Sequence, residues 1–324
     1  MAEFKSRNVF KLARGFKLFL HLKVGVTRSR GVNSKPGRKH AEKLRRKQDR
    51  FEEQRGPKQD RRPEHQPKAQ VSGSYEVYDP DAVNYKGVVL PPKRARPCGA
   101  SYKNNEYYLF SAKRDAEMLV ENLGLSLESC LLDVGCGPGR LAIGILESVG
   151  EIEKYRGVDV KEDFVRWGQR HITPKHPNFL FIHIDVENPR YHLSGAKIET
   201  GFAFPFAEEE FDIITLYSVF THMLADDIRT YLNEFQRMLR PTGRIFLTAF
   251  LEDEVPPVTE NPEGYLGQEW KGPLHCVRYN REFFEALLDE NGFRLDNSYR
   301  IGDKSKGDPP EEGQSGLYIS RKAL

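Results

Sequence analysis

Short runs of strand-forming residues alternate with apolar residues at helical spacing from about residue 111 to the end of the chain. Such alternation is typical of a parallel sheet that is covered by helices on both faces. We therefore expect the doubly wound α/β class, with a mostly parallel sheet of seven strands. Ser111 is expected to cap a helix that precedes the sheet, and Gly124 is expected to end it. The strand-like runs are 130–134, 155–159, 179–184, 211–217, 244–250, 293–299 and 317–320.

The charge is divided unevenly along the chain. Residues 1 to 70 contain 21 Lys and Arg against 7 Asp and Glu, whereas the formal net charge of all 324 residues is only +3. Residues 28–70 include almost no aliphatic side chains, so this segment cannot bury enough apolar surface to offset its loss of conformational entropy. We expect residues 1–74 to form a basic, largely disordered arm and residues 75–324 to form the folded domain.

The basic arm has several candidate roles. Residues 4–24 place apolar and basic residues at helical spacing, which predicts a short amphipathic helix that could lie on an anionic membrane surface. The same composition fits an organelle transit peptide. The polybasic part could bind nucleic acid by releasing counterions. It could also be a solvated tail that only aids solubility.

The cysteines indicate a reducing setting, and the hydropathy indicates that no segment crosses a membrane. Cys98, Cys130, Cys136 and Cys276 form no Cys-x-x-Cys pair, so neither a disulfide framework nor a zinc site is expected. No apolar run reaches the roughly 20 residues that a transmembrane helix requires. We expect a cytoplasmic protein without a transmembrane segment, with peripheral membrane association or import into an organelle as the alternatives.

A glycine-rich loop follows the first predicted strand, with the spacing Asp133-x-Gly135-x-Gly137-x-Gly139. Glycines let the backbone approach a ligand closely, and the N–H groups at the start of the next helix favour an anion. In a dinucleotide-binding fingerprint the third glycine would fall on Arg140. The spacing therefore disfavours an NAD-binding domain, which stays the alternative.

Acidic residues also end the second and third predicted strands, at Asp159 and Asp185. The glycine loop and these two acids, in this order, resemble the class I S-adenosylmethionine-dependent methyltransferases over roughly residues 106 to 324. The resemblance implies a Rossmann-like fold, methyltransferase activity and S-adenosylmethionine as the cofactor. Residues 172–179 and 188–191 look like a bacterial subgroup of this family, which does not identify the substrate.

The resemblance also assigns roles within the cofactor site. Asp159 would accept hydrogen bonds from the two ribose hydroxyls, with Val160 against the adenine. Asp185 would accept one from the adenine amino group beside the backbone of the next residue, and Ser218 would line the methionine end. Asp133 would support the loop and the ammonium group. The implied cofactor-binding residues are Asp133, Gly135, Gly137, Gly139, Asp159, Val160, Asp185, Val186 and Ser218.

The candidate catalytic residue is His222, which lies just beyond the fourth predicted strand. Methyl transfer from a sulfonium depends mainly on alignment, but a hydroxyl acceptor also needs a base, and the ordinary pKa of histidine suits that role. A substrate-orienting or structural role is the alternative. Asp226 and Asp227 are expected to serve the dipole of a helix start, and no metal is expected.

The acceptor is expected to lie among the irregular segments 102–110, 187–206 and 251–280. Residues 216–219 are not Asn-Pro-Pro-Tyr, and Cys98 precedes the core domain, so the motifs of amino-group and pyrimidine methylation are missing from the expected places. We therefore expect methyl transfer to a small-molecule or saccharide hydroxyl, with a small molecule or glycan as the partner. The alternatives are an RNA- or ribosome-associated or protein methyltransferase anchored by the basic arm, and a catalytically inactive S-adenosylmethionine-binding or scaffold protein.

Overall fold

The computed structural model describes residues 81–97, 99–198, 202–301 and 313–322. The basic arm expected for residues 1–74, with its amphipathic helix, lies outside the described residues, and its boundary with the folded domain stays a prediction. In the part that is described, no helix is long and apolar enough to cross a membrane.

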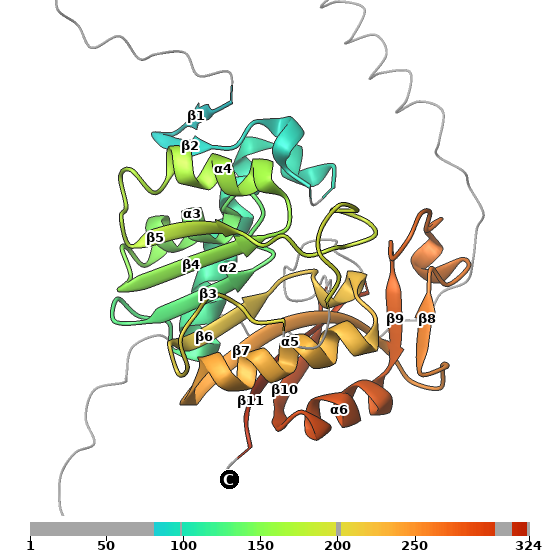
Figure 1. Cartoon of the computed structure of the whole chain (residues 1–324). Helices are drawn as coiled ribbons and strands as arrows, with labels where there is room; N and C mark the ends of the chain where they lie inside the picture. Colours follow the sequence, from blue (N-terminus) through green and yellow to red (C-terminus); the bar gives the residue numbers. More distant parts are fainter. Residues whose placement is uncertain (1–80, 98, 199–201, 302–312, 323–324) are drawn as a thin grey trace, which may run out of the picture. The chain divides into compact units, whose positions relative to one another are not determined.

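The path through the central sheet follows the strand order β10-β11-β7-β6-β3-β4-β5 (Figure 1). Strands β3 to β7 are paired in parallel, whereas β11 is antiparallel to both of its neighbours. From β3 the chain first builds β4 and β5 on one side and then β6 and β7 on the other. This reversal leaves a crevice at the carboxyl ends of the central strands, where α/β proteins bind ligands. The strands are Cys130–Val134 (β3), Lys154–Asp159 (β4), Phe179–His183 (β5), Phe211–Leu216 (β6), Leu239–Glu252 (β7), Phe293–Arg300 (β10) and Ser315–Arg321 (β11).

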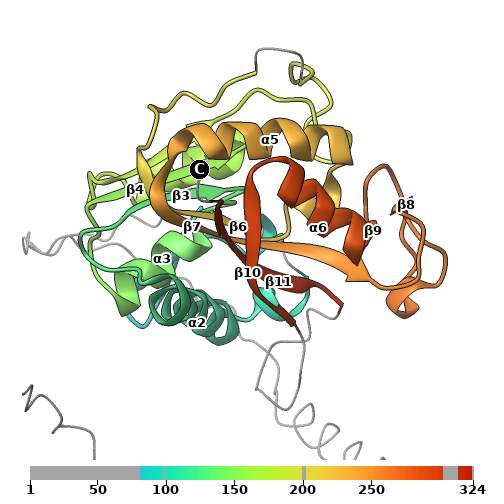
Figure 2. The same ribbon diagram turned by 90° about the horizontal axis from the view of Figure 1, so that it is seen from below.

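Helices cover both faces of this sheet. Figure 2 shows α2 and α3 on one face and α5 and α6 on the other, and α4 packs against β5 in the same core cluster as α2 and α3. Leu131 of β3 belongs to that cluster, whereas Leu132 packs with α5 and α6. The predicted doubly wound α/β class is therefore confirmed. The helices are Asn105–Leu123 (α2), Arg140–Ser148 (α3), Glu162–His171 (α4), Ala225–Met238 (α5) and Arg281–Glu290 (α6).

The leading helix, α2, begins before the residue that was expected to cap it. Its N-cap is Asn104, whose side chain accepts a hydrogen bond from the Tyr107 N–H at 3.0 Å. Ser111 is buried inside the helix, where its hydroxyl donates to the Tyr108 carbonyl. Asparagine and serine cap helices about equally well, so local sequence could not choose between them. Gly124 ends α2 in the left-handed conformation, as predicted.

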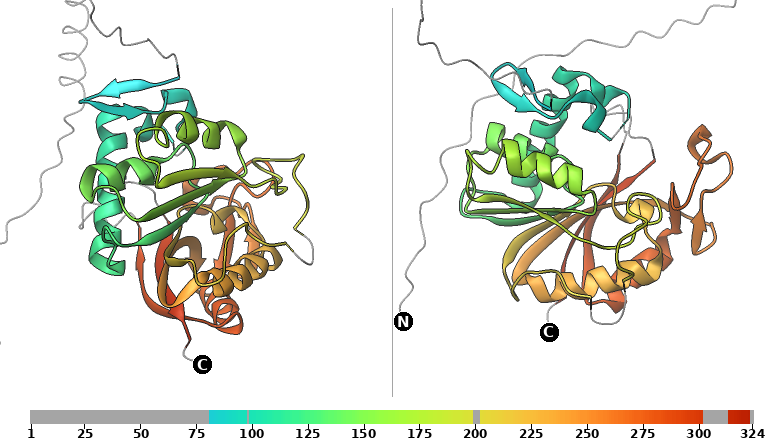
Figure 3. Two further views of the ribbon diagram at one scale, coloured as in Figure 1. Left: turned by 60° about the vertical axis from the view of Figure 1, so that its left-hand side comes forward. Right: turned by 45° about the horizontal axis from the view of Figure 1, so that its top comes forward.

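Two short strands extend the predicted seven. Strand β9 (Val277–Asn280) pairs in parallel with the end of β7, and β8 (Val258–Glu260) pairs antiparallel with β9. Within the described residues the sheet therefore has nine strands. The connection 251–280, which was expected to be irregular, thus contains two strands, and one of them pairs with β7. A separate hairpin of β1 (Val83–Tyr85) and β2 (Val88–Leu90) lies beside α4 (Figure 3).

Helices α2 and α3 are in close contact at Gly144. A Cβ atom at this position would lie 1.9 Å from the carbonyl oxygen of Ala112 in α2. Only glycine fits this helix crossing without a shift of backbone. The crossing bears on the site, because α3 begins directly after the glycine loop.

Gly144→Ala is expected to lower the free energy of unfolding by about 1 to 3 kcal/mol, because the added methyl group must push two packed helix backbones apart. Urea unfolding followed by circular dichroism measures the change. Glu147→Ala, on the exposed side of α3, is the control and should change stability by less than about 0.5 kcal/mol. Equal unfolding midpoints for Gly144→Ala and the wild type would show that the helices are not packed this closely.

Candidate functional site

Three segments that follow neighbouring strands open onto one cavity of about 560 Å³. They are the glycine loop after β3, the end of β4 and the segment after β6. The cavity lies where the strand order reverses, which is the usual ligand site of such sheets. Its volume is within the range of cavities that hold a small organic ligand.

The glycine loop turns sharply over the end of β4. The N–H groups of Gly135 and Cys136 both donate to the Val158 carbonyl, at 2.8 and 3.0 Å. Gly135 has a φ of 73°, and a Cβ there would lie 2.5 Å from Val219 Cγ2. Gly137 lines the cavity, and a Cβ there would meet no atom within 4 Å. The loop thus brings bare backbone to the cavity wall, with room for a ligand against it.

Asp159 ends β4 at the same wall. Its Oδ2 accepts a hydrogen bond from the Gly137 N–H and its Oδ1 accepts one from the Lys161 N–H, both at 2.8 Å. Burial raises the pKa of this carboxyl, and the two N–H donors oppose the rise. Each carboxylate oxygen keeps a further acceptor position, so the group can bind the two hydroxyls of a ribose. Val160 and Val186 line the same cavity.

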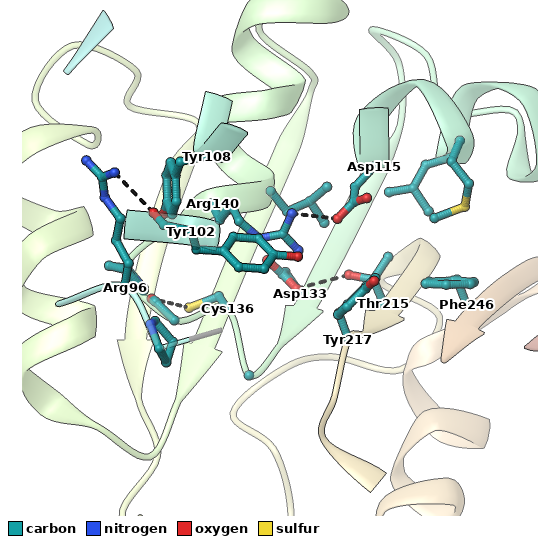
Figure 4. Close-up of a pocket in the computed structure, with 17 residues that line it drawn as sticks. Arg96, Tyr102, Tyr108, Asp115, Asp133, Cys136, Arg140, Thr215, Tyr217 and Phe246 are labelled. Carbon is teal, nitrogen blue, oxygen red and sulfur yellow. Dashed lines mark hydrogen bonds and ion pairs between the residues drawn. The ribbon is translucent and has the colours of Figure 1, made fainter. Parts of the chain in front are cut away.

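Asp133 lies beneath the glycine loop and does not line this cavity. Its buried carboxylate accepts hydrogen bonds from the Tyr155 hydroxyl at 2.6 Å and the Thr215 hydroxyl at 3.1 Å. Figure 4 shows it at a second, smaller cavity of about 70 Å³. Burial raises the pKa of Asp133 to about 6. In this position Asp133 supports the loop from below rather than contacting a ligand in the larger cavity.

Two further residues of the expected cofactor site, Gly139 and Asp185, do not line the larger cavity. Gly139 caps α3, and a Cβ there would lie 2.8 Å from Ile172 Cδ1, so packing requires this glycine. The Asp185 side chain is 68% exposed, and its carboxylate lies 2.7 Å from His192 Nε2. Its neighbours Ile184 and Val186 line the cavity instead.

Arg140, the first residue of α3, fastens the end of the glycine loop to α2. Its guanidinium lies 2.6 Å from the Asp115 carboxylate, and it is placed over the rings of Tyr102 and Tyr217, at 5.4 and 5.3 Å from their centroids (Figure 4). A dinucleotide fingerprint would have glycine at this position. Here an arginine occupies it, and its side chain joins the glycine loop to α2. Tyr217 lines both cavities, so this cluster reaches the wall of the larger one.

Ser218 follows β6 with a φ of 56°. Positive φ is uncommon for residues other than glycine, and such strain gathers at functional sites. The Ser218 N–H donates to the Thr248 hydroxyl at 2.8 Å, and the Ser218 hydroxyl lies 2.9 Å from Gln314 Nε2. Ser218 and Gln314 both line the cavity. The strained turn therefore presents the Ser218 hydroxyl to the ligand space, beside the side-chain amide of Gln314.

His222 ends the short helix η3 (Phe220–His222), just beyond β6. Its Nδ1 lies 3.0 Å from the Leu274 carbonyl, so the contact assigns the proton of a neutral ring to Nδ1 and leaves a lone pair on Nε2. Burial lowers the pKa of His222 to about 4. The imidazole, which lines the cavity, is therefore neutral at physiological pH.

Two of the three segments expected to hold the acceptor line the cavity. The segment after β5 contributes Arg190 and Tyr191, and the connection from β7 to α6 contributes Trp270 and His275. The third segment, 102–110, lines the smaller cavity instead. This part of the cavity wall is thus built from two connections that are far apart in the sequence.

Arg190, Asp227 and Gln314 are among the cavity residues that were not predicted individually. Asp227 was expected only to serve the dipole of α5, but it lines the cavity, and burial raises its pKa. An acid at a helix start has the same sequence signature in either role. Among the residues that the structure describes, no group of three His, Cys, Asp or Glu side chains could hold a metal ion.

The methyltransferase domain family matches residues 131–243 of the chain. A demethylmenaquinone methyltransferase of Lysinibacillus sphaericus is 25% identical over 137 residues, which cover 42% of this chain and 51% of the relative. A malonyl-(acyl-carrier protein) O-methyltransferase of Pseudescherichia vulneris is 22% identical over 178 residues, which cover 55% of this chain and 58% of the relative. The chain thus spans a little over half the length of these two relatives. A SAM-dependent methyltransferase from Aquifex aeolicus has a crystal structure with a TM-score of 0.42 and 18% identity, covering 63% of this chain and 88% of that one.

The matched segment runs from β3 into β7 and contains the glycine loop, Asp159 and Ser218. It therefore includes the strand ends on which the larger cavity is built. Residues 131–243 of the chain thus match the methyltransferase domain family.

Proposed function

We propose that this chain transfers the methyl group of S-adenosylmethionine to a hydroxyl group of a small acceptor molecule. The observation that carries the proposal is a single shared cavity. Asp159 and the bare backbone of Gly137 line it, and so do His222 and the aromatic side chains of Tyr191 and Trp270. Cofactor and acceptor can therefore be held in contact, as a direct transfer requires.

The ends of β3 and β4 fit the proposed cofactor. Asp159 would bind the ribose hydroxyls, and Val160 and Val186 would contact the adenine. Gly137 would give the ligand access to the backbone, and Ser218 would line the methionine end. When bound, S-adenosylmethionine supplies a methyl carbon that its sulfonium already activates, so the residues of the chain mainly orient the two reactants.

At the acceptor end, Nε2 of His222 would accept the hydrogen bond of the acceptor hydroxyl. A base whose conjugate acid has a pKa of about 4 is weak, so it would take the proton as the methyl group moves and not before. An acidic hydroxyl of the phenol kind suits such a base better than a saccharide hydroxyl. The relatives named for demethylmenaquinone and malonyl-(acyl-carrier protein) support a small acceptor group.

Asp159→Ala should weaken S-adenosylmethionine binding by at least about tenfold, because each lost hydrogen bond to a charged group is worth about 1.5 to 3 kcal/mol. Isothermal titration measures the affinity. Asp163→Ala removes an exposed acid of α4 and should bind as the wild type does. Full affinity in a folded Asp159→Ala variant, or tight binding of NAD in place of S-adenosylmethionine, would show that the cofactor site is assigned wrongly.

His222 should titrate near pH 4 and not near its ordinary value of 6.5. Because the folded-state pKa is lowered, the ring is neutral at neutral pH and gains its proton only as the pH falls through about 4. Proton NMR of the ring signals follows this directly. Methyl transfer should accordingly show no His222 step between about pH 6 and 8, and His222→Gln should lower kcat more than it changes KM. A step near pH 6.5 that disappears in His222→Gln would contradict the assignment.

The activity itself is read from the release of S-adenosylhomocysteine with metabolite, glycan, RNA and protein fractions as acceptors. Release with the metabolite or glycan fraction should occur with the wild type and be lost in Asp159→Ala. Release with RNA alone, or with no fraction at all, would argue against the proposed acceptor class.

A further inference from the structure

The wall of the larger cavity carries an arginine without an acidic partner. Arg190 follows β5 and lines the cavity, and its Nε is buried without a hydrogen-bond acceptor. In the described part of the chain, no carboxylate pairs with its guanidinium. Arg237 and Arg240, by contrast, pair with carboxylates at 2.7 Å. A guanidinium presents five N–H donors in a fork that matches a carboxylate or a phosphate, so Arg190 lacks the partner that its chemistry fits.

Local contacts fix the place where Arg190 enters the cavity. The Asn188 side-chain oxygen accepts hydrogen bonds from the N–H groups of Arg190 and Tyr191, at 3.0 and 3.1 Å. The Asn188 amide in turn donates to the His222 carbonyl at 3.4 Å. The turn that carries Arg190 is therefore held directly against the segment that carries the candidate base.

Several aromatic rings line the cavity with Arg190, whose guanidinium lies 5.3 Å from the centroid of the Tyr191 ring. The Tyr191 and His222 rings meet edge-on at 5.5 Å, and the Trp270 and His275 rings do so at 5.2 Å. Burial lowers the pKa of both imidazoles, and the positive charge of Arg190 adds to this effect. Both histidines are thus neutral at neutral pH, and Arg190 is the positively charged side chain beside them, whereas Lys161 lines the same cavity beyond the end of β4.

Two acids, Glu187 and Asp227, line the same cavity. The pKa of Asp227 is raised by burial first and then by the charges of Asp226 and Glu187, so the two acids of the cavity lie near each other. They would favour a cationic acceptor, whereas Arg190 would favour an anionic one. The arginine is the stronger indication, because it has a buried donor without an acceptor and neither acid has a buried oxygen without a donor.

We propose that Arg190 binds a carboxylate or phosphate group of the methyl acceptor. The acceptor is then an anionic molecule that carries a hydroxyl on a planar, largely apolar body. This inference rests on the proposed function and names the substrate class of the same site. Arg190 anchors the anionic group, Tyr191 and Trp270 contact the planar body, and His222 receives the hydroxyl.

The test uses the full chain loaded with S-adenosylhomocysteine and matched probe molecules. Isothermal titration measures the affinity for each probe. Para-hydroxybenzoate and para-hydroxybenzamide test for a carboxylate, and phenyl phosphate and phenol test for a phosphate. In at least one pair the anionic probe should bind the wild type roughly tenfold more tightly than the neutral one. Arg190→Gln should abolish this difference, whereas Arg166→Gln, which changes an exposed arginine of α4, should keep it.

A separate titration of S-adenosylhomocysteine distinguishes the two proposals. Its affinity should be the same in the wild type and Arg190→Gln, since Arg190 is assigned to the acceptor. The Arg190 assignment is overturned if neutral probes or para-hydroxybenzylamine bind as tightly as the anionic probes, or if no anionic probe binds. If S-adenosylhomocysteine does not bind the wild type, the proposed function fails, and the probes then test Arg190 on the unloaded chain.

Discussion

The buried carboxylate of Asp133 is the contact on which the rest of the site depends. It is the last residue but one of the central strand β3 and accepts hydrogen bonds from Tyr155 of β4 and Thr215 of β6, so it joins the three strands whose ends form the cavity wall. Because its folded-state pKa is raised, Asp133 favours folding most when it is protonated, and this contribution is lost as the pH rises through about 6. At neutral pH the buried charge therefore costs stability, and what it provides is a fixed arrangement of the strand ends.

The glycine loop is held from both sides above this carboxylate. On the β4 side, the loop N–H groups are bound by the Val158 carbonyl and by the Asp159 carboxylate. On the α2 side, Arg140 pairs with Asp115 and is placed over two tyrosine rings. This end of the cavity is therefore backbone held by hydrogen bonds and an ion pair, and a ligand there would meet donors and acceptors that are already in place.

Most of the fold and much of the cavity lining at the ends of β3 and β4 could be predicted, because their signals are local. The alternation of strands and helices indicates the sheet, and Gly135, Gly137 and Asp159 lie next to the strands that place them. Local signals failed where the direction of a side chain decided the outcome. Asp185 follows a strand just as Asp159 does, but it turns away from the cavity towards His192. The strands β8 and β9 were missed because β9 depends on pairing with the end of β7 and β8 on pairing with β9, and not on a pattern of their own.

The acceptor end could be predicted only as a set of loops, since contacts between distant segments place its side chains. Ser218 meets Gln314 across 96 residues of sequence, and His222 meets the Leu274 carbonyl across 52. The periodicity of apolar residues in the sequence does not predict such long-range contacts. This division has a consequence for specificity under the proposed function. Strand order fixes the part of the cavity proposed for the cofactor, whereas side chains on two connections, after β5 and after β7, line the part proposed for the acceptor. A change of charge at Arg190 would then alter which acceptor is bound while the strand ends that position Asp159 stay as they are.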